Sequence, residues 1–504
     1  MKLALALVIV STIVSLPTAF AQEIPKKLPL LGSLDWQPTP EHPVGWRGDN
    51  SGRYPGATPP ITWAKDKNVL WKSPPFEKWG KPIGNPIIVG DRIFLSTQPT
   101  TLVCLSKLDG HILWMRSNNY YDATPEAERQ ANPAFAETIA PLAAKLREIE
   151  DAIAKDGGLG KPDKLKQMIE EREKLDDQIY TAIHPLDKKY ARPHPDHPTA
   201  PTPCSDGKSV FIWTGHGVAA CYDLNGNRRW CTYANRAPGG GGHHGSHGSP
   251  TLVGDRMLAF IQDLICFDTK TGAVLWTAPV DVIGGYNYSL PVVSCDRQPT
   301  ALVIKGERWL MGLRVADGKQ AWISDPLAPD MNSAPWTEGS LVLEGGISYW
   351  FGSRGTVAYR YPDQAGQKGS LIVNRDYNDK GLVCGSCLYD NGLLYGVSFD
   401  GELRVFDATT LKLVYTQTLG IADKTAKVAF YPSLSMAGQH LYATNNNGAT
   451  EVFAPGRVFK SEAINGRLNE KTWPGDESTW GNLVFEGTRL YYRTTSGLYC
   501  IGEK

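Results

Sequence analysis

Hydrophobic residues gather along most of this chain in short runs that turn residues separate. The clearest copy, residues 249–276, reads SPTLVGDRMLAFIQDLICFDTKTGAVLW. It holds an apolar run, a Gly-Asp turn, two further apolar runs, a turn with glycine, and a fourth run that ends in tryptophan. Residues 85–114 repeat this order. Short apolar runs bounded by Gly, Asp and Asn are typical of β-strands. Each copy therefore predicts a small four-stranded sheet.

The copies recur at a nearly constant spacing. Their anchors, the first apolar residue of each second strand, are Ile93, Val210, Met257, Leu302, Ile347, Leu393, Leu441 and Leu490. After the first interval of 117 residues, the spacings are 47, 45, 45, 46, 48 and 49. Four strands per about 40–50 residues are typical of a β-propeller blade. We predict an all-β fold, an eight-bladed β-propeller of four-stranded antiparallel blades. Seven blades are the alternative if the weak copy at residues 341–373 is not a full blade.

The last copy is incomplete, and its missing strand has a counterpart near the start of the chain. Residues 481–504 supply three strands, whereas residues 68–73 (NVLWKS) are an unmatched fourth strand. Pairing the two would close the ring and remove an open sheet edge. We therefore expect a propeller at residues 62–504, preceded by an extended segment at residues 22–61. This segment, with its Arg-Gly-Asp turn at residues 47–49, is expected to run along the surface.

The long first interval contains an insertion rich in Ala, Glu, Lys and Leu. Its apolar residues follow a spacing of three and four: Phe135, Ile139, Leu142, Leu146, Ile149 and Ile153, then Leu165, Met168, Leu175 and Ile179. This pattern predicts an antiparallel α-helical hairpin at residues 124–185. Because it joins the outer strand of one blade to the inner strand of the next, we expect it to stand on one face of the disc. It is either a self-contained insertion or a lid or docking arm.

The N-terminus has the form of a cleavable signal peptide. Lys2 precedes an apolar stretch at residues 3–16, and Ala19 and Ala21 form a small-residue cleavage site. The stretch is too short to span a membrane. We expect cleavage after Ala21 and a periplasmic or secreted protein. Lys and Arg (52) balance Asp and Glu (52), which disfavours a nucleic-acid partner. Nothing in the sequence fixes the oligomeric state.

The cysteines divide into a repeated position and one close pair. Cys104, Cys221, Cys266 and Cys500 occupy the same place on the third strand, and we interpret them as small buried apolar residues. Cys384 and Cys387 form the close pair. They are a disulfide, half of a metal site or two thiols.

These residues carry a family resemblance. Residues 266–276 (CFDTKTGAVLW) resemble the repeat of the PQQ-like, quinoprotein-type β-propeller family, and residues 222–230 and 315–322 are degenerate versions. The resemblance implies that each repeat tryptophan docks on the neighbouring blade: Trp71, Trp114, Trp230, Trp276 and Trp322. The N-terminal passage is similar to exported planctomycete-type members and, more distantly, to the outer-membrane assembly propeller lipoprotein. Quinoprotein dehydrogenases carry adjacent cysteines that this chain lacks, which disfavours PQQ as a cofactor.

The most unusual local sequence is a loop rich in glycine and histidine at residues 238–250. Imidazoles are good ligands of transition metals and act as acids or bases near neutral pH. His243 and His247 can converge on a divalent metal, whereas a structural role of the loop is the plain alternative. His244, His216, Tyr286, Tyr288, Trp336 and Arg354 are further ligand-binding candidates expected on the same face. Asp400 and Trp480 are also expected there.

Three functions follow from these features. The leading hypothesis is an exported binding or scaffold protein that recognises a protein or glycan through the face that bears the hairpin and the His-rich loop. The alternative is a metal- or His-assisted enzyme that acts on polysaccharide at the channel mouth. A PQQ-dependent dehydrogenase is the least favoured, and no catalytic residue can be assigned.

Overall fold

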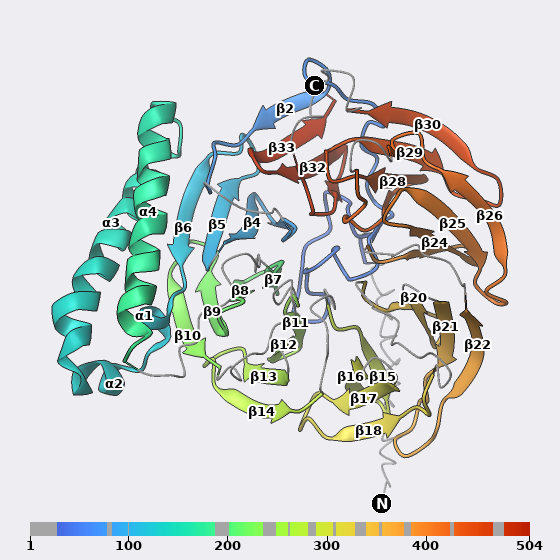
Figure 1. Cartoon of the computed structure of the whole chain (residues 1–504), viewed down its shortest axis with the longest axis horizontal. Coiled ribbons are helices and arrows are strands. Elements are labelled where there is room, and N and C mark those ends of the chain that lie inside the picture. The colour runs from blue at the N-terminus through green and yellow to red at the C-terminus, as the bar shows by residue number, and fades with distance from the viewer. Residues whose placement is uncertain are drawn as a thin grey trace, which may run out of the picture.

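Eight four-stranded sheets form a closed ring around a central channel (Figure 1). The computed structural model describes residues 28–503 except 78–82, 99, 187–200, 235–247, 261–262, 281–288, 306–308, 328–338, 352–354, 377–384, 424–427 and 467–477. The predicted eight-bladed propeller is therefore confirmed. The weak copy forms a complete fifth blade, because its strands pair in the same order as those of the other blades.

Within each blade the strands run from the channel outward. Blades 1 to 4 consist of β3 (Ile87–Val89), β4 (Arg92–Thr97), β5 (Thr101–Ser106), β6 (Ile112–Ser117); β7 (Cys204–Ser205), β8 (Ser209–Trp213), β9 (Val218–Asp223), β10 (Arg228–Tyr233); β11 (Thr251–Val253), β12 (Arg256–Phe260), β13 (Leu264–Asp268), β14 (Val274–Ala278); β15 (Val292–Cys295), β16 (Gln298–Lys305), β17 (Trp309–Arg314), β18 (Gln320–Ile323). Blades 5 to 7 consist of β19 (Val342–Glu344), β20 (Ile347–Phe351), β21 (Gly355–Arg360), β22 (Ser370–Asp376); β23 (Leu388–Asp390), β24 (Leu393–Val397), β25 (Glu402–Asp407), β26 (Leu413–Thr418); β27 (Ser435–Ala437), β28 (His440–Thr444), β29 (Thr450–Ala454), β30 (Lys460–Asn465).

The eighth blade joins the two ends of the chain. It consists of β31 (Val484–Glu486), β32 (Arg489–Thr494) and β33 (Gly497–Gly502), and its outer strand is β2 (Val69–Lys72). β2 pairs antiparallel with β33, so that Val69 faces Ile501 and Trp71 faces Cys500. A strand from the beginning of the chain thus covers an edge that would otherwise be open.

The third-strand cysteines share one structural role. Each of them stands opposite the outer-strand tryptophan of its own blade: Cys104 opposite Trp114, Cys221 opposite Trp230, Cys266 opposite Trp276, and Cys500 opposite Trp71. All four thiols are fully buried. Burial raises the pKa of Cys221, Cys266 and Cys500 to about 12, so they stay protonated at neutral pH. They are packing residues rather than nucleophiles.

The outer-strand tryptophans link neighbouring blades. The indole of Trp114 lies over Gly226, in the turn between the third and fourth strands of the next blade, and its Nε1 donates to the Leu224 carbonyl at 3.1 Å. Gly226 has a φ of +86°, and a Cβ there would lie 2.8 Å from the ring. Trp230 and Trp276 donate in the same way to Thr269 and Val315, at 2.9 and 3.0 Å. The glycine is needed both for its backbone angle and for the closeness of the ring.

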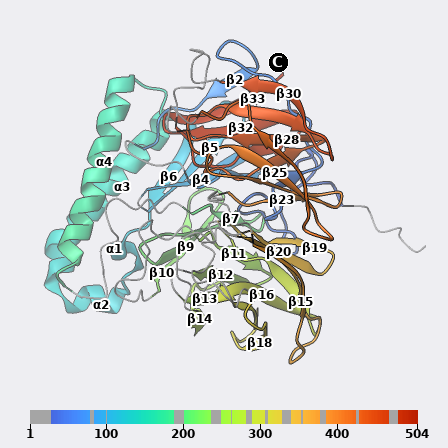
Figure 2. The same ribbon diagram turned by 45° about the vertical axis from the view of Figure 1, so that its right-hand side comes forward.

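The insertion is a helical arm, which we define as residues 120–183. It contains α1 (Tyr120–Ala123), α2 (Glu126–Ala131), the π-helix η1 (Phe135–Ile139), α3 (Ala140–Asp156) and α4 (Pro162–Ile183). α3 and α4 form the predicted hairpin. The arm lies beside the outer strands β6 and β10 at the rim of the ring (Figures 1 and 2). The expectation that it stands on a face of the disc is therefore wrong.

The reason is a second buried face on the hairpin. Besides the apolar stripe between the helices, Ile153, Leu165 and Ile169 pack into the core of blade 1 with Ile112 and Met115. A two-helix hairpin with only one apolar seam would stand apart from the ring. The hairpin of α3 and α4 has two apolar seams, and the second one packs against the side of the first blade.

The N-terminal segment was expected on the surface, and this too is wrong. Residues 28–58, which we call the plug, cross the channel at the centre of the ring (Figure 1). β1 (Arg53–Tyr54) pairs in parallel with β27 of blade 7, and Val44 pairs with Ser205 of blade 2. The Arg47 side chain is only 2% exposed and donates to the carbonyls of Cys387 and Leu434, at 3.3 and 2.5 Å. Inner strands offer unpaired backbone groups to the channel, and the plug satisfies several of them.

Candidate functional site

The propeller has two faces that differ in what they carry. The connection face holds the turns between second and third strands and the links from one blade to the next. The plug face holds the turns between first and second strands, where Gly90, Gly438 and Gly487 bond to residues of the plug. Both mouths of the channel are candidate ligand sites.

The structure places His216 away from the channel. It lies in the turn between β8 and β9, where its ring contacts Tyr120 and Tyr180 of the arm, at centroid distances of 5.6 and 5.8 Å. Its role there is to hold the arm on blade 2. The other predicted candidates lie outside the described residues: His243, His244, His247, Tyr286, Tyr288, Trp336 and Arg354. Cys384 also lies outside them, whereas Cys387 is a buried free thiol.

A buried polar cluster fixes the arm to blade 1. The Nη1 of Arg172, whose side chain is fully buried, donates to the hydroxyls of Thr101 (2.6 Å) and Ser117 (3.0 Å). The Glu150 carboxylate accepts from the Ser117 N–H at 2.7 Å, and the Asp176 carboxylate lies on the same helix as Arg172. Burial raises the pKa of Glu150 and Asp176. Arg147, paired with Glu150 at 2.9 Å, and then Arg172 oppose the rise for Glu150, and Arg172 opposes it for Asp176. An arm held this way is not a lid that swings over the channel.

A ring of small polar side chains surrounds the channel on the connection face. Each of its members lies two or three residues before an inner strand: Asn85, Thr202, Ser249, Ser289, Ser340, Ser386, Ser433 and Asn482. In seven of the eight steps the backbone N–H of one member donates to the side chain of the next, for example Ser340 to Ser386 and Ser386 to Ser433, both at 2.8 Å. The last blade is joined to the first, because the Asn482 N–H donates to Asn85 at 2.8 Å.

Sequence reasoning missed this ring although a signal was present. A Ser, Thr or Asn recurs once per period just before each first strand, often followed by proline. One polar residue per period is a weak signal beside four apolar strands. At one position the ring meets the plug, because the Ser289 hydroxyl donates to the Asn50 side chain at 2.6 Å.

Three half-buried aromatic residues stand in a row on the connection face. Phe399 follows β24 of blade 6, Tyr431 precedes β27 of blade 7, and Trp480 precedes β31 of blade 8. Ring centroids are 5.4 Å apart for Phe399 and Tyr431, and 5.9 Å apart for Tyr431 and Trp480. The Asp400 carboxylate is exposed at the same edge. The row spans three blades.

Backbone bonds between blades hold this aromatic row in place. The Phe430 N–H donates to the Phe399 carbonyl at 3.0 Å, and the Thr479 N–H donates to the Asn446 carbonyl at 2.9 Å. Each aromatic residue is therefore next to a residue tied to the neighbouring blade. A site built on fixed elements loses little entropy when a ligand binds.

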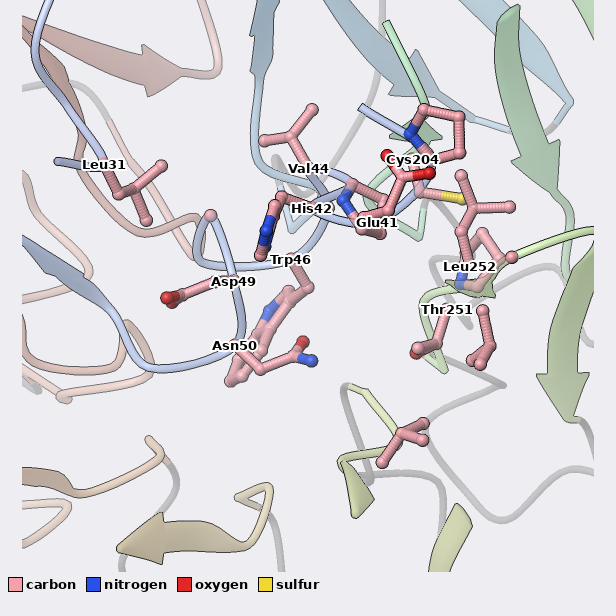
Figure 3. A pocket seen from close by; sticks show the side chains of 18 of the residues that line it. Leu31, Glu41, His42, Val44, Trp46, Asp49, Asn50, Cys204, Thr251 and Leu252 are labelled. Atoms are coloured by element: carbon pink, nitrogen blue, oxygen red, sulfur yellow. The ribbon is translucent and has the colours of Figure 1, made fainter. Parts of the chain in front are cut away.

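The plug divides the opposite mouth of the channel into two cavities. One has a volume of about 510 Å³ and lies between the plug and blade 3. His42, Trp46 and Asn50 stand on one side of it, and Thr251 and Leu252 of β11 on the other (Figure 3). The second cavity, of about 540 Å³, lies toward blades 6 and 7. Trp36, His42 and Asp49 border both.

Two buried residues of the plug occupy the middle of the channel. Trp46 and Arg47 of the plug are buried within the channel, and Arg47 bonds to the carbonyls of two inner-strand starts. Within the described ranges, no group of three or more His, Cys, Asp or Glu side chains is placed to hold a metal ion.

Comparison with known proteins agrees with this fold. Residues 215–375 match the family model described as outer membrane protein assembly factor BamB. BamB from Moraxella catarrhalis superposes with a TM-score of 0.50 at 10% identity, over 84% of this chain and 94% of that one. Quinohemoprotein alcohol dehydrogenase ADHIIG from Pseudomonas putida HK5 gives 0.50 at 10% identity, over 92% and 76%. The computationally designed protein Ika8 gives 0.50 at 9% identity, over 86% and 100%. No curated protein sequence matches this chain.

Proposed function

Since this chain is a propeller of the PQQ-like repeat family, we propose that it is an exported binding protein that recognises a glycan on its connection face. The family fold is compatible with a binding or scaffold role. The ligand class has to come from the site itself, because a fold hosts many functions.

The aromatic row is the observation that carries the proposal. Phe399, Tyr431 and Trp480 are half-buried rings on three neighbouring blades. Phe399 and Tyr431 pack edge to face at an interplanar angle of 86°, and Tyr431 and Trp480 are tilted by 46°. Exposed parts of aromatic rings suit the apolar faces of sugar rings, and nearby polar groups suit their hydroxyls. The exposed Asp400 and the half-buried Asn447 supply such groups. A row, in contrast to a single deep pocket, favours a chain of sugars.

Export rests on the first 21 residues, which have the order of a signal peptide. Among the helices of the described residues, none is long and apolar enough to cross a membrane. N-terminal sequencing of the protein expressed with its full chain in a bacterial host should give Gln22 as the first residue. A first residue of Met1 would contradict export through this signal.

Affinity electrophoresis through a panel of soluble polysaccharides tests the glycan site. Laminarin, xylan, chitosan and soluble cellulose derivatives are suitable probes. For the polysaccharide that retards the protein, Trp480→Ala should weaken binding by at least about 30-fold, since a tryptophan that anchors a ligand is worth about 2 kcal/mol or more. Trp36→Ala, a half-buried tryptophan on the plug face, is the matched control and should bind normally. Equal binding by the two variants would refute the site.

The enzyme alternative depends on His243 and His247, which lie outside the described residues. Measuring reducing ends released from the same polysaccharides separates the two functions. A binding protein releases none, whereas a metal- or His-assisted enzyme releases them and loses this activity in a His243→Ala/His247→Ala variant. Metal analysis of the purified protein distinguishes the metal form of that enzyme.

A further inference from the structure

The plug reveals how the inner strands can bind an extended chain. The N–H and the carbonyl of Val44 exchange two hydrogen bonds with Ser205 of blade 2, both at 2.9 Å. In blade 7 the Met436 N–H donates to the Gly52 carbonyl at 2.9 Å. Ser205 and Met436 occupy equivalent positions in their blades. They follow Thr202 and Ser433, the members of the ring of small polar residues, by three positions. The channel-side edge of an inner strand therefore accepts a further strand at this position.

In blade 3 the equivalent residue is Leu252 of β11. The tight turn at residues 254–255 makes Val253 and Arg256 the hydrogen-bonded pair of the hairpin, so the backbone groups of Leu252 point away from β12 toward the channel. Among the described residues, none forms a backbone hydrogen bond with Leu252 across the channel. The plug satisfies this position in blades 2 and 7 and leaves it open in blade 3.

The open edge lies in the wall of the plug-face cavity described above. Thr251, Leu252 and Val253 line this cavity, whose volume of about 510 Å³ is within the range of ligand sites. Trp46 lines the plug side (Figure 3). The exposed residues Glu41 and His42 also line the cavity, so it reaches the surface. A buried strand edge and an apolar wall are the two parts that a strand-binding groove needs.

The charge of the lining selects among peptides. Glu41 is an exposed acidic residue of the cavity lining, and no Lys or Arg is among the described lining residues. Asp49 also lines the cavity, but its carboxylate accepts from the N–H and the hydroxyl of Ser51, at 3.0 and 2.5 Å. The guanidinium of Arg47, which lies between two lining residues, is turned to the carbonyls of Cys387 and Leu434. A cationic side chain is therefore favoured next to the added strand.

We propose that this cavity binds an extended peptide of a partner protein, which adds as a short strand to the channel-side edge of β11 and carries a Lys or Arg toward Glu41. Main-chain hydrogen bonds to Leu252 would give affinity, and the Glu41 carboxylate would give selectivity. This site is on the face opposite the aromatic row and does not depend on the glycan site.

The test begins with a random heptapeptide display library selected on the full chain. Selected peptides should alternate apolar residues and carry Lys or Arg. The best peptide is then made in two forms, N-methylated on either set of alternate amides. Because only one edge of a strand pairs, one form should bind at least about tenfold more weakly, while the other stays within about twofold. Failure to enrich any peptide, or equal binding of the two forms, overturns the proposal.

Variants of the protein test the charge selection. Glu41→Gln should weaken binding of the selected peptide by about tenfold at low salt and by less at high salt. Asp35→Asn is the matched control, because Asp35 is an exposed carboxylate of the plug that does not line the cavity. Equal losses in both proteins would show general attraction to an acidic surface and would sink the assignment. Trp480→Ala should bind the peptide normally.

Discussion

Replacing Arg172 with methionine should release the helical arm from the ring. Arg172 is fully buried between the arm and blade 1, with Glu150 and Asp176 as its buried carboxylate neighbours. Methionine fills most of the volume but removes the cation and its bonds to Thr101 and Ser117. The negative charges of the two buried carboxylates are then less well balanced by nearby positive charge. Breaking a buried charge cluster by removing one member costs about 3–5 kcal/mol.

The loss should depend on pH with a definite sign. Burial raises the folded-state pKa of both carboxyl groups above the ordinary values of 4.5 for Glu150 and 3.8 for Asp176. Folding therefore takes up protons, and stability falls as the pH rises from those values through the raised ones. Without Arg172 the folded-state pKa values rise further. The deficit of Arg172→Met should be larger at pH 7 than at pH 4, because at the lower pH both carboxyl groups are mostly protonated in the folded state of wild type and variant alike.

Hydrogen exchange of amides in α3 and α4 is the suitable assay, because the arm can open without the ring unfolding. A loss of about 3–5 kcal/mol lowers their protection by on the order of 10²- to 10³-fold at pH 7. Glu150→Gln/Asp176→Asn added to Arg172→Met should restore most of the protection, because the triple variant buries no uncompensated carboxylate at these positions. Arg129→Gln, which breaks an exposed pair with Glu126, is the control and should change little. Protection within twofold of wild type, or a loss of equal size at pH 4 and 7, would refute this reasoning.

The other predictions concern the propeller blades. Gly272→Ala should lower the thermal midpoint more than Gly254→Ala, because both have positive φ but only a Cβ at Gly272 would meet a ring, that of Trp230, at 2.5 Å; equal shifts would mean that backbone strain alone decides. Asn482→Ala should lower the free energy of unfolding in denaturant by about 1–3 kcal/mol, since it leaves the buried Ser433 N–H without its acceptor. An unchanged midpoint would show that the ring of small polar residues does not stabilise the fold. The four third-strand thiols should resist iodoacetamide at pH 8 in the folded protein and react after denaturation, as read by mass spectrometry, because burial raises their pKa; rapid labelling of the folded protein would contradict that burial.

The repeat period predicted the blades because each blade is a local unit of four consecutive strands. The period also predicted the place of β2. The strand near Val69 belonged to no copy of the repeat, and the last copy, which ends near Gly502, lacked its fourth strand. The plug was missed because much of its pairing is made by backbone groups, and because its buried side chains, such as Trp46, Arg47 and Tyr54, follow neither a strand nor a helix period. The arm was misplaced because Glu150 and Arg172 read as solvent-facing charges until their partners on blade 1 are known.

The plug also explains why the two mouths of the channel are suited to different ligands. Eight inner strands present eight channel-side edges, and the ring of small polar residues ties only their starts together on the connection face. That leaves the edges themselves to be satisfied from the plug face, which the plug does in blades 2 and 7 and not in blade 3. A strand-like ligand therefore finds its partner groups on the plug face. On the connection face those groups are already used, and recognition falls to side chains such as Tyr431 and Trp480. The proposed peptide site and the proposed glycan site therefore lie at opposite mouths of the channel, and we predict that a peptide and a glycan do not compete for this protein.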